Sequence, residues 1–298
     1  MNPLSGRLGR AFTVIAILAA QPVIAKEAAA DVQAGLKSLS DSKFQDAAKA
    51  FIAAFKAGDP DGAFYMARML ELELGVRADP QSAIALYAAG SQKGSAAAKN
   101  RLGMLHMEGI GVLQDYAEGS KLICEAADGG DVHGLFNCGS LFDDGRGVKQ
   151  DKAKALDFYR KAAEKGHVAA KNVLAQALIK GDVLPKNEKQ AVELFQQTAA
   201  DGNPVGLFSL AQAFAAGFGV DKDLVKSHAY FNLAAARGHP DAVDARATTE
   251  KALVPEQLAQ AQQLARAWRA SGPDGKPLDP PNIGGEPQPA SGAPAKSP

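Results

Sequence analysis

The chain has 298 residues with equal numbers of basic and acidic side chains, 33 of each, and 46% hydrophobic residues. The first 25 residues carry Arg7, Arg10 and no acid, so the remainder holds 31 basic and 33 acidic residues, a net charge of −2. This balance excludes the basic footprint of a nucleic-acid-binding domain and a polybasic membrane surface.

The N-terminus has the three parts of a secretory signal peptide, which we assign to residues 1–25. Two arginines precede the apolar stretch Ala11–Ala20, and small residues follow up to Ala25. We expect cleavage after Ala25, with Ala30 as the second choice. The apolar stretch is too short to span a bilayer as an ordinary helix, and an uncleaved anchor is the alternative interpretation. The sequence therefore predicts an exported protein, periplasmic or secreted.

After a shortened first unit at residues 31–60, one pattern returns every 36 residues up to residue 239. Two registers hold glycine, a third holds Asp or Asn, and a fourth holds an aromatic or branched residue. Several registers with one period of this length indicate a solenoid. The glycine registers are Gly94, Gly130, Gly166, Gly202 and Gly238, and Gly109, Gly145, Gly181 and Gly217.

Each unit is expected to contain two helices, because apolar residues recur at helical spacing on either side of a glycine-containing turn. The sequence thus predicts an all-α solenoid of helix-turn-helix repeats. Capping helices and a Pro-rich tail that builds no core are expected to follow. The predicted parts are a hairpin at 31–60, repeats at 61–95, 96–131, 132–167, 168–203 and 204–239, capping helices at 240–270 and the tail at 271–298.

Small residues and caps recur in the same registers. One column holds Gly62, Ala98, Gly134, Ala170 and Gly206, which we interpret as close contacts between helix backbones. The glycines that end each unit fit a left-handed helix stop. The residue after each of them is a predicted helix N-cap. These residues are Asp131, His167, Asn203 and His239.

The recurring pattern A-x-x-x-L-G-x-x-[YH]-x-x-G-x-G-V, followed by A-A-x-x-G, resembles the SEL-one-like repeat, a branch of the tetratricopeptide superfamily. The resemblance covers residues 61–239 and implies a right-handed α-solenoid whose members mostly bind other proteins. It implies no single shared activity. In one repeat the pattern stands as Ala98, Leu102, Gly103, His106, Gly109, Gly111 and Val112, then Ala126, Ala127 and Gly130.

Cys124 and Cys138 are the only cysteines. They lie at similar distances from the turn at Gly130, so antiparallel helices would bring them face to face, and exported proteins keep disulfides. A secreted branch of the family also bridges neighbouring helices, which supports a disulfide. The alternative is two buried small residues, since Cys138 shares a column of apolar residues. His133 is the one side chain that would join them at a metal, too few ligands for a metal site.

Other motifs favour ordinary structural roles. The Gly109-x-Gly111 type of pair lacks the third glycine and preceding strand of a dinucleotide-binding loop and recurs as an interhelix turn. The five histidines form no catalytic group. Residues 40–43 match the S-x-x-K motif of penicillin-recognising enzymes, but a solvated turn is favoured because the K-T-G partner is missing. We therefore expect neither a cofactor nor a metal.

In tetratricopeptide-like solenoids the first helices line the concave face, so this resemblance assigns a protein-binding surface to the first helices here. The set mixes aromatic, methionine and amide side chains, which suits an extended peptide. The alternative is a partly exposed face without a ligand. The assigned residues are Phe64, Arg68, Glu71, Asn100, Met104, Met107, His133, Phe136, Ser140, Asp143, Asn172, Gln176, Phe208 and Gln212.

The sequence thus favours an exported, non-enzymatic adaptor that binds a protein or peptide on its concave face, in envelope regulation or host interaction. The first alternative is a secreted hydrolase acting on β-lactams or cell-wall peptides, as claimed for some relatives, in which Ser40 would be the nucleophile. The second is a structural spacer whose Pro-rich tail makes the contact.

Overall fold

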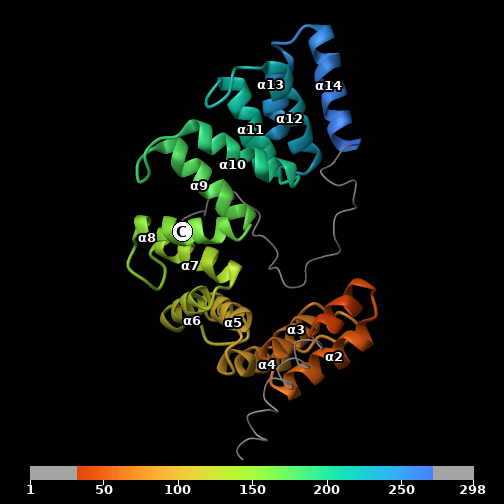
Figure 1. Cartoon of the computed structure of the whole chain (residues 1–298), viewed down its shortest axis with the longest axis vertical. Helices are drawn as coiled ribbons and strands as arrows, with labels where there is room; N and C mark the ends of the chain where they lie inside the picture. Colours follow the sequence, from red (N-terminus) through yellow and green to blue (C-terminus); the bar gives the residue numbers. More distant parts are fainter. Residues whose placement is uncertain (1–31, 271–298) are drawn as a thin grey trace, which may run out of the picture. The chain divides into compact units, whose positions relative to one another are not determined.

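The computed structural model describes residues 32–270, so the expected signal peptide and the Pro-rich tail lie outside the described residues. Within this range every regular element is a helix, and none of the helices is long and apolar enough to cross a membrane. The helices pack in consecutive pairs with a 36-residue repeat (Figure 1). The predicted fold class, an all-α solenoid of helix-turn-helix repeats, is confirmed.

The chain divides into two compact units after Gly134, and each is described by itself. In the first unit residues 32–40 are helical, and from α2 to α6 each helix packs against the next. α7 begins in this unit and ends in the second. The bounds are α2 (Phe44–Ala57), α3 (Pro60–Glu71), α4 (Pro80–Gln92), α5 (Ala96–Glu108), α6 (Tyr116–Asp128) and α7 (Val132–Asp144).

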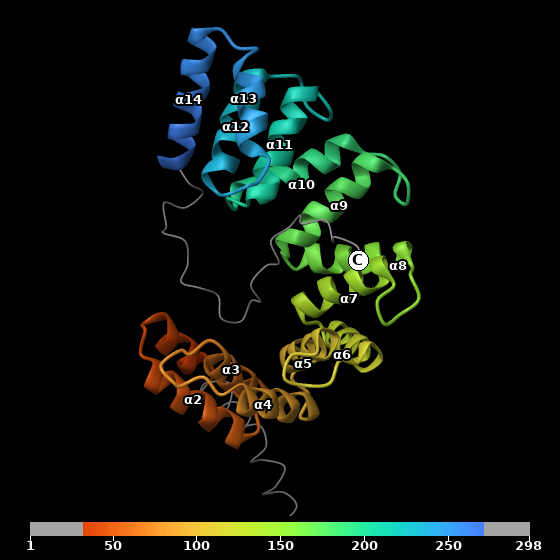
Figure 2. The same ribbon diagram turned by 180° about the vertical axis from the view of Figure 1, so that it is seen from behind.

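In the second unit α8 to α12 again pack in sequence order, and both α13 and α14 pack against α12 (Figure 2). The two last helices therefore cover the end of the repeat array. The bounds are α8 (Lys152–Glu164), α9 (Val168–Lys180), α10 (Glu188–Ala200), α11 (Pro204–Ala216), α12 (Leu224–Ala236), α13 (Ala242–Glu250) and α14 (Pro255–Ala270).

The helix boundaries follow from caps that the sequence repeats. Gly166 and Gly202 have φ angles of +92° and +76°, a left-handed conformation that glycine adopts without steric cost. The next residue then caps the following first helix: the Nδ1 of His167 and the Oδ1 of Asn203 accept backbone N–H groups of α9 and α11. The second helices begin after side-chain caps at Asp79, Asp115, Asp151, Asn187 and Asp223.

The column of small residues lies where first helices cross the second helix of the preceding repeat. A Cβ atom built on Gly62 of α3 would lie 2.5 Å from the carbonyl oxygen of Phe51 in α2. One built on Gly206 of α11 would lie 2.8 Å from the backbone nitrogen of Ala199 in α10. Since backbone atoms cannot move aside as a flexible side chain can, these glycines set the distance between repeats.

Gly62→Ala is therefore expected to lower the free energy of unfolding by about 1–3 kcal/mol through overpacking. Gly129→Ala is a matched control, because Gly129 is exposed with a φ of −73° and its nearest neighbour would be the Cβ of Ala96 at 3.1 Å. There the change should stay below about 1 kcal/mol. Urea unfolding followed by circular dichroism measures both; equal effects would show that the contact at Gly62 does not limit packing.

Candidate functional site: an open groove between α9 and α11

A groove of about 520 Å³ lies in the second unit between α9 and α11, the first helices of two successive repeats. Its floor is Phe195 of α10, which is almost fully buried in the core of this unit. The lining combines apolar side chains with the polar Gln176, Ser209, Gln212 and Lys180. The lining residues are Gln176, Ile179 and Lys180 of α9, Ser209, Gln212, Ala215 and Ala216 of α11, and Phe195 and Phe218.

Two glutamines stand at equivalent positions on the two walls. Gln176 and Gln212 are 36 residues apart, so the repeat places both on the same face of successive first helices. Both are exposed, and neither side chain forms a hydrogen bond with any residue between 32 and 270. Each amide therefore keeps two N–H donors and a carbonyl acceptor free for a ligand.

One charge lies in the groove. Lys180, at the end of α9, is the only ionised side chain among the lining residues, and it is exposed. It has no ion-pair partner in the described part of the chain. The groove thus combines an apolar recess, two free amides and a single positive charge.

The corresponding groove of the first unit, between α3 and α5, is filled by its own side chains. Three repeats, or 108 residues, separate the two sets of positions. Where the open groove has neutral residues, the first unit has a cluster of charged and hydroxyl side chains. Arg68 corresponds to Gln176, Glu71 to Ile179, Tyr87 to Phe195, and Arg101 to Ser209.

Glu71 binds the other three side chains. Arg68 Nη1 lies 2.8 Å from Glu71 Oε2, and the Tyr87 hydroxyl donates to the same oxygen at 2.6 Å. Arg101 forms an ion pair with Glu71 Oε1. The Arg68 side chain is only 4% exposed, so this is a largely buried network and not a surface pair. The space that is open between α9 and α11 is therefore closed between α3 and α5.

The network keeps Glu71 ionised and Tyr87 protonated. Burial alone would raise the pKa of the Glu71 carboxyl, but hydrogen bonds from Arg101 and Tyr87, with the charges of both arginines, hold this pKa below its ordinary value. Burial, together with the neighbouring carboxylate, raises the pKa of Tyr87. The phenol thus remains a donor and the carboxylate an acceptor throughout the physiological pH range.

The fourteen residues assigned to the concave face differ widely in exposure. Only Gln176 and Gln212 are exposed, and these two lie in the open groove. Seven are half-buried: Glu71, Met104, His133, Phe136, Ser140, Asp143 and Phe208. Five are buried, so their side chains face the interior: Phe64, Arg68, Asn100, Met107 and Asn172.

Some of these residues contact the residue that follows the glycine at the end of the repeat, 31 residues further along the chain. His167 and Asn203 cap the next helix, but the predicted cap at His239 is wrong, because α13 begins after Asp241. Phe136 stacks on His167 with ring centroids 4.5 Å apart, and Phe208 stacks on His239 at 3.9 Å. The column alternates Phe and Asn, and at Asn172 the contact becomes a hydrogen bond from its amide to Asn203 Oδ1, 3.0 Å long. These contacts join successive repeats, and a binding role for the same residues stays a prediction.

Both cysteines are disulfide-bonded. Since the chain has only two, Cys124 of α6 and Cys138 of α7 are bonded to each other, as favoured from the sequence. Cys138 is also fully buried, which is the burial that the alternative of two small buried residues expected for it. His133 joins no metal site, and residues 32–270 contain no group of three or more His, Cys, Asp or Glu side chains placed to hold a metal.

The S-x-x-K stretch forms a turn before α2. The Ser40 hydroxyl donates to the carbonyl oxygen of Lys37 at 2.7 Å, and Lys43 pairs with Asp41 at 3.2 Å. The serine and lysine side chains thus use other partners. Among the histidines, His228 is buried, neither ring nitrogen has a hydrogen bond, and Nε2 lies 3.9 Å from Glu250 Oε2. Burial lowers its pKa, which favours the neutral ring.

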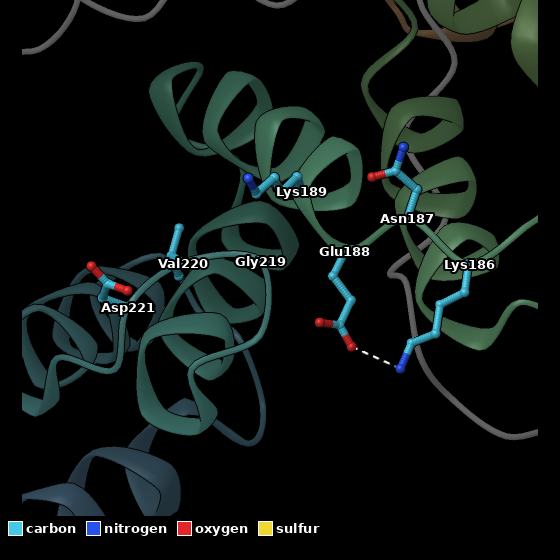
Figure 3. Close-up of a pocket in the computed structure, with 7 residues that line it drawn as sticks. All are labelled: Lys186, Asn187, Glu188, Lys189, Gly219, Val220 and Asp221. Atoms are coloured by element: carbon cyan, nitrogen blue, oxygen red, sulfur yellow. Dashed lines mark ion pairs between the residues drawn. The ribbon is translucent and has the colours of Figure 1, made fainter.

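A second hollow, of about 560 Å³, lies between two interhelix loops of the same unit (Figure 3). Three of its polar side chains already have structural roles. Lys186 pairs with Glu188 at 2.8 Å, and Asn187 caps α10. The hollow is lined by Lys186, Asn187, Glu188, Lys189, Gly219, Val220 and Asp221.

Sequence reasoning found the two glutamines but missed most of the groove around them. Ile179, Lys180, Ala215 and Ala216 follow one helical turn after Gln176 and Gln212, so they extend the same face. That helical spacing is the sequence signal that would have predicted these residues as part of the groove. Phe218 belongs to the loop after α11, and no helical spacing would have placed it there.

Comparison with known proteins identifies the repeat. A sequence model of the Sel1 repeat matches residues 60–95, 96–131, 132–167, 168–203 and 204–239. A solved Sel1 repeat protein from Oxalobacter formigenes shares 26% identity with a TM-score of 0.67, over 80% of this chain and 97% of that one. No curated protein sequence matches the chain.

A second solved structure is a protective antigen of uropathogenic Escherichia coli with an SLR fold. It shares 23% identity with a TM-score of 0.55, over 82% of this chain. The match spans only 61% of the Escherichia coli protein. At this level of identity the similarity shows the shared fold.

Proposed function

The chain belongs to the Sel1 repeat family, and we propose that it is an exported, non-enzymatic scaffold that holds a polypeptide partner in the groove between α9 and α11. Sel1 repeat proteins are generally protein-interaction scaffolds. The assignment of this particular groove rests on this chain's own residues. A role in envelope regulation or host interaction is compatible with export.

The observation that carries the proposal is the pair of free amides above an apolar floor. A peptide bond has one N–H donor and one C=O acceptor, and a glutamine amide offers the matching acceptor and donor. Gln176 and Gln212 can therefore bond the backbone of an extended segment while the recess over Phe195 takes a side chain. This division between backbone bonds and a side-chain pocket is common in peptide recognition.

Export is supported by two independent features. The apolar N-terminal stretch follows two arginines and ends in small residues, as in a secretory signal. The bond between Cys124 and Cys138 fits an oxidising compartment, where disulfides persist. Together they favour the periplasm or the cell exterior.

The proposal predicts that Gln176→Ala/Gln212→Ala weakens partner binding roughly thirtyfold, since it removes two hydrogen bonds that contribute about 1 kcal/mol each. Partners are captured from an envelope extract on the immobilised chain, and the affinity of each purified partner is then measured by calorimetry. A matched control is Gln196→Ala/Gln262→Ala, which removes two exposed helix glutamines outside the groove. Equal affinity of the groove variant and this control for every purified partner would contradict the proposal.

A further inference from the structure

We propose that the groove selects an extended segment in which an apolar side chain is flanked by a carboxylate, and that the α3–α5 groove does not share this selectivity. The inference rests on the proposed polypeptide-binding function and specifies the ligand class. It follows from three properties of the lining: its apolar floor, its free amides and its single charge.

The apolar floor selects a large apolar side chain. Phe195 forms the floor, and Ile179 and Phe218 pack against the same core, so a side chain entering here is removed from water on several sides. Fully burying a leucine or phenylalanine side chain strengthens binding by about tenfold to 150-fold. In the first unit the corresponding positions hold Tyr87 and Arg101. The space between two first helices thus accommodates one long side chain.

The two glutamines select an extended backbone. They stand one repeat apart on opposite walls, and both are free of hydrogen bonds within the described residues. A helical segment has its backbone groups bonded internally and offers none to these amides. An extended segment offers an N–H and a C=O at every residue, so it can bond both walls while it crosses the groove.

Lys180 selects the carboxylate. It is the only charge in the lining, it is exposed, and no acidic side chain lines the groove with it. An exposed ion pair contributes about 0.2–1 kcal/mol, which corresponds to at most about a fivefold change in affinity. The carboxylate is that of an Asp or Glu side chain, since a segment that bonds both walls crosses the groove and continues beyond it.

The α3–α5 groove cannot bind the same ligand. Both arginines there are paired with Glu71, and these side chains occupy the positions that line the open groove. The two grooves can therefore be compared within one chain, because the same positions of the repeat line both of them. Side chains fill these positions in the first unit and leave the groove open in the second. Ile179→Glu/Ser209→Arg transfers the central ion pair of the filled groove to the open one.

The experiment uses the full chain and three fluorescent hexapeptides, with binding measured by polarisation at low salt. The first has an internal leucine–aspartate pair with both ends blocked, the second ends in leucine with a free carboxylate, and the third has leucine–asparagine with both ends blocked. We expect the leucine–aspartate peptide to bind about threefold to fivefold more tightly than the asparagine peptide. Tighter binding of the peptide with the free C-terminal carboxylate than of the leucine–aspartate peptide would overturn the side-chain source.

Variants then assign the effect to residues. Lys180→Gln should remove the difference between the carboxylate and asparagine peptides, while Lys152→Gln, at an exposed lysine outside the groove, should preserve it. Ile179→Glu/Ser209→Arg should abolish binding of all three peptides, and Gln212→Ala, a milder change at an exposed site, should weaken all three. Equal binding of the carboxylate and asparagine peptides, or no saturable binding up to about 1 mM, would overturn the ligand class.

The chain's own sequence offers another occupant, since Leu278 and Asp279 lie between Pro277 and Pro280. Tighter peptide binding by Leu278→Ser/Asp279→Asn in the full chain would identify this segment as a competitor with the proposed chemistry, and so would support the ligand class.

Failure of the ligand class is distinguishable from failure of the scaffold function. A captured partner that depends on Gln176 and Gln212 but lacks the apolar–acidic pair would sustain the function and overturn only this inference.

Discussion

Glu71→Ala is expected to lower the free energy of unfolding by about 3–5 kcal/mol, because it removes the carboxylate from a buried charged network. The substitution leaves the Arg68 guanidinium, 4% exposed, and the buried Tyr87 hydroxyl without the oxygen that both contact. A buried charge that loses its counter-charge retains its cost of dehydration. Urea unfolding of the variant and the wild type, monitored by circular dichroism, measures the difference.

A surface pair provides the control for this prediction. Asp157→Ala breaks the pair with Arg160, which is as short, at 2.7 Å, but has both side chains about half exposed. Its loss should cost less than about 1 kcal/mol. A quadruple variant, Arg68→Gln/Glu71→Ile/Tyr87→Phe/Arg101→Ser, installs the residues of the open groove and should recover most of the stability, since neutral residues replace the whole network. Equal effects of Glu71→Ala and Asp157→Ala would contradict the assigned role.

The pH dependence of stability gives the same network a second readout. The pKa of Glu71 is lower in the folded chain than its ordinary value of 4.5, so the unfolded state binds the proton more readily. Stability from this group is therefore complete above about pH 4.5 and is lost as the pH falls through the folded-state pKa. Glu71→Ala should show a shallower loss of stability below pH 4.5 than the wild type.

Removal of the disulfide by Cys124→Ala/Cys138→Ala is expected to lower the free energy of unfolding by about 3 kcal/mol, because the bond closes a short loop in the unfolded chain. Alanine suits both sites, since Cys138 is fully buried and a serine hydroxyl there would add a cost of its own. Thermal unfolding of both proteins, with and without a reductant, measures the effect.

The reductant distinguishes the effect of the disulfide on stability from the effect of replacing the two side chains. The wild type in reductant should approach the stability of the alanine pair in oxidising buffer, and the alanine pair should not respond to the reductant. A wild type that is equally stable with and without reductant, with mass spectrometry showing that the bond is broken, would refute the stabilising role.

The repeat architecture could be predicted because each of its determinants is local and recurs. Glycines such as Gly166 end helices, and the residues after them, such as Asn203, begin the next ones, within a few residues of sequence. The column of small residues that includes Gly62 and Gly206 likewise indicated close helix contacts. In the structure, backbone atoms of the preceding helix lie against both glycines. Fold class therefore followed from the period and the caps alone.

The candidate site could be predicted only in part, because exposure depends on pairs of residues in different repeats. Asn172 and Gln176 lie one helical turn apart on α9, yet Asn172 is buried by its bond to Asn203 while Gln176 is exposed. Whether a groove is open depends in the same way on the complementarity of Glu71 with Arg101, 30 residues apart. Positions along one helix do not reveal such pairing.

Site-specific photo-cross-linking tests most directly whether the α9–α11 groove holds the partner. A photoreactive amino acid replaces Gln212 in one protein and Met104, the equivalent residue three repeats earlier, in another. We predict a cross-linked polypeptide from position 212, lost when Ile179→Glu/Ser209→Arg fills the groove, and none from position 104. Cross-linking from position 104 alone, or an adduct at 212 that persists in the filled groove, would contradict the account.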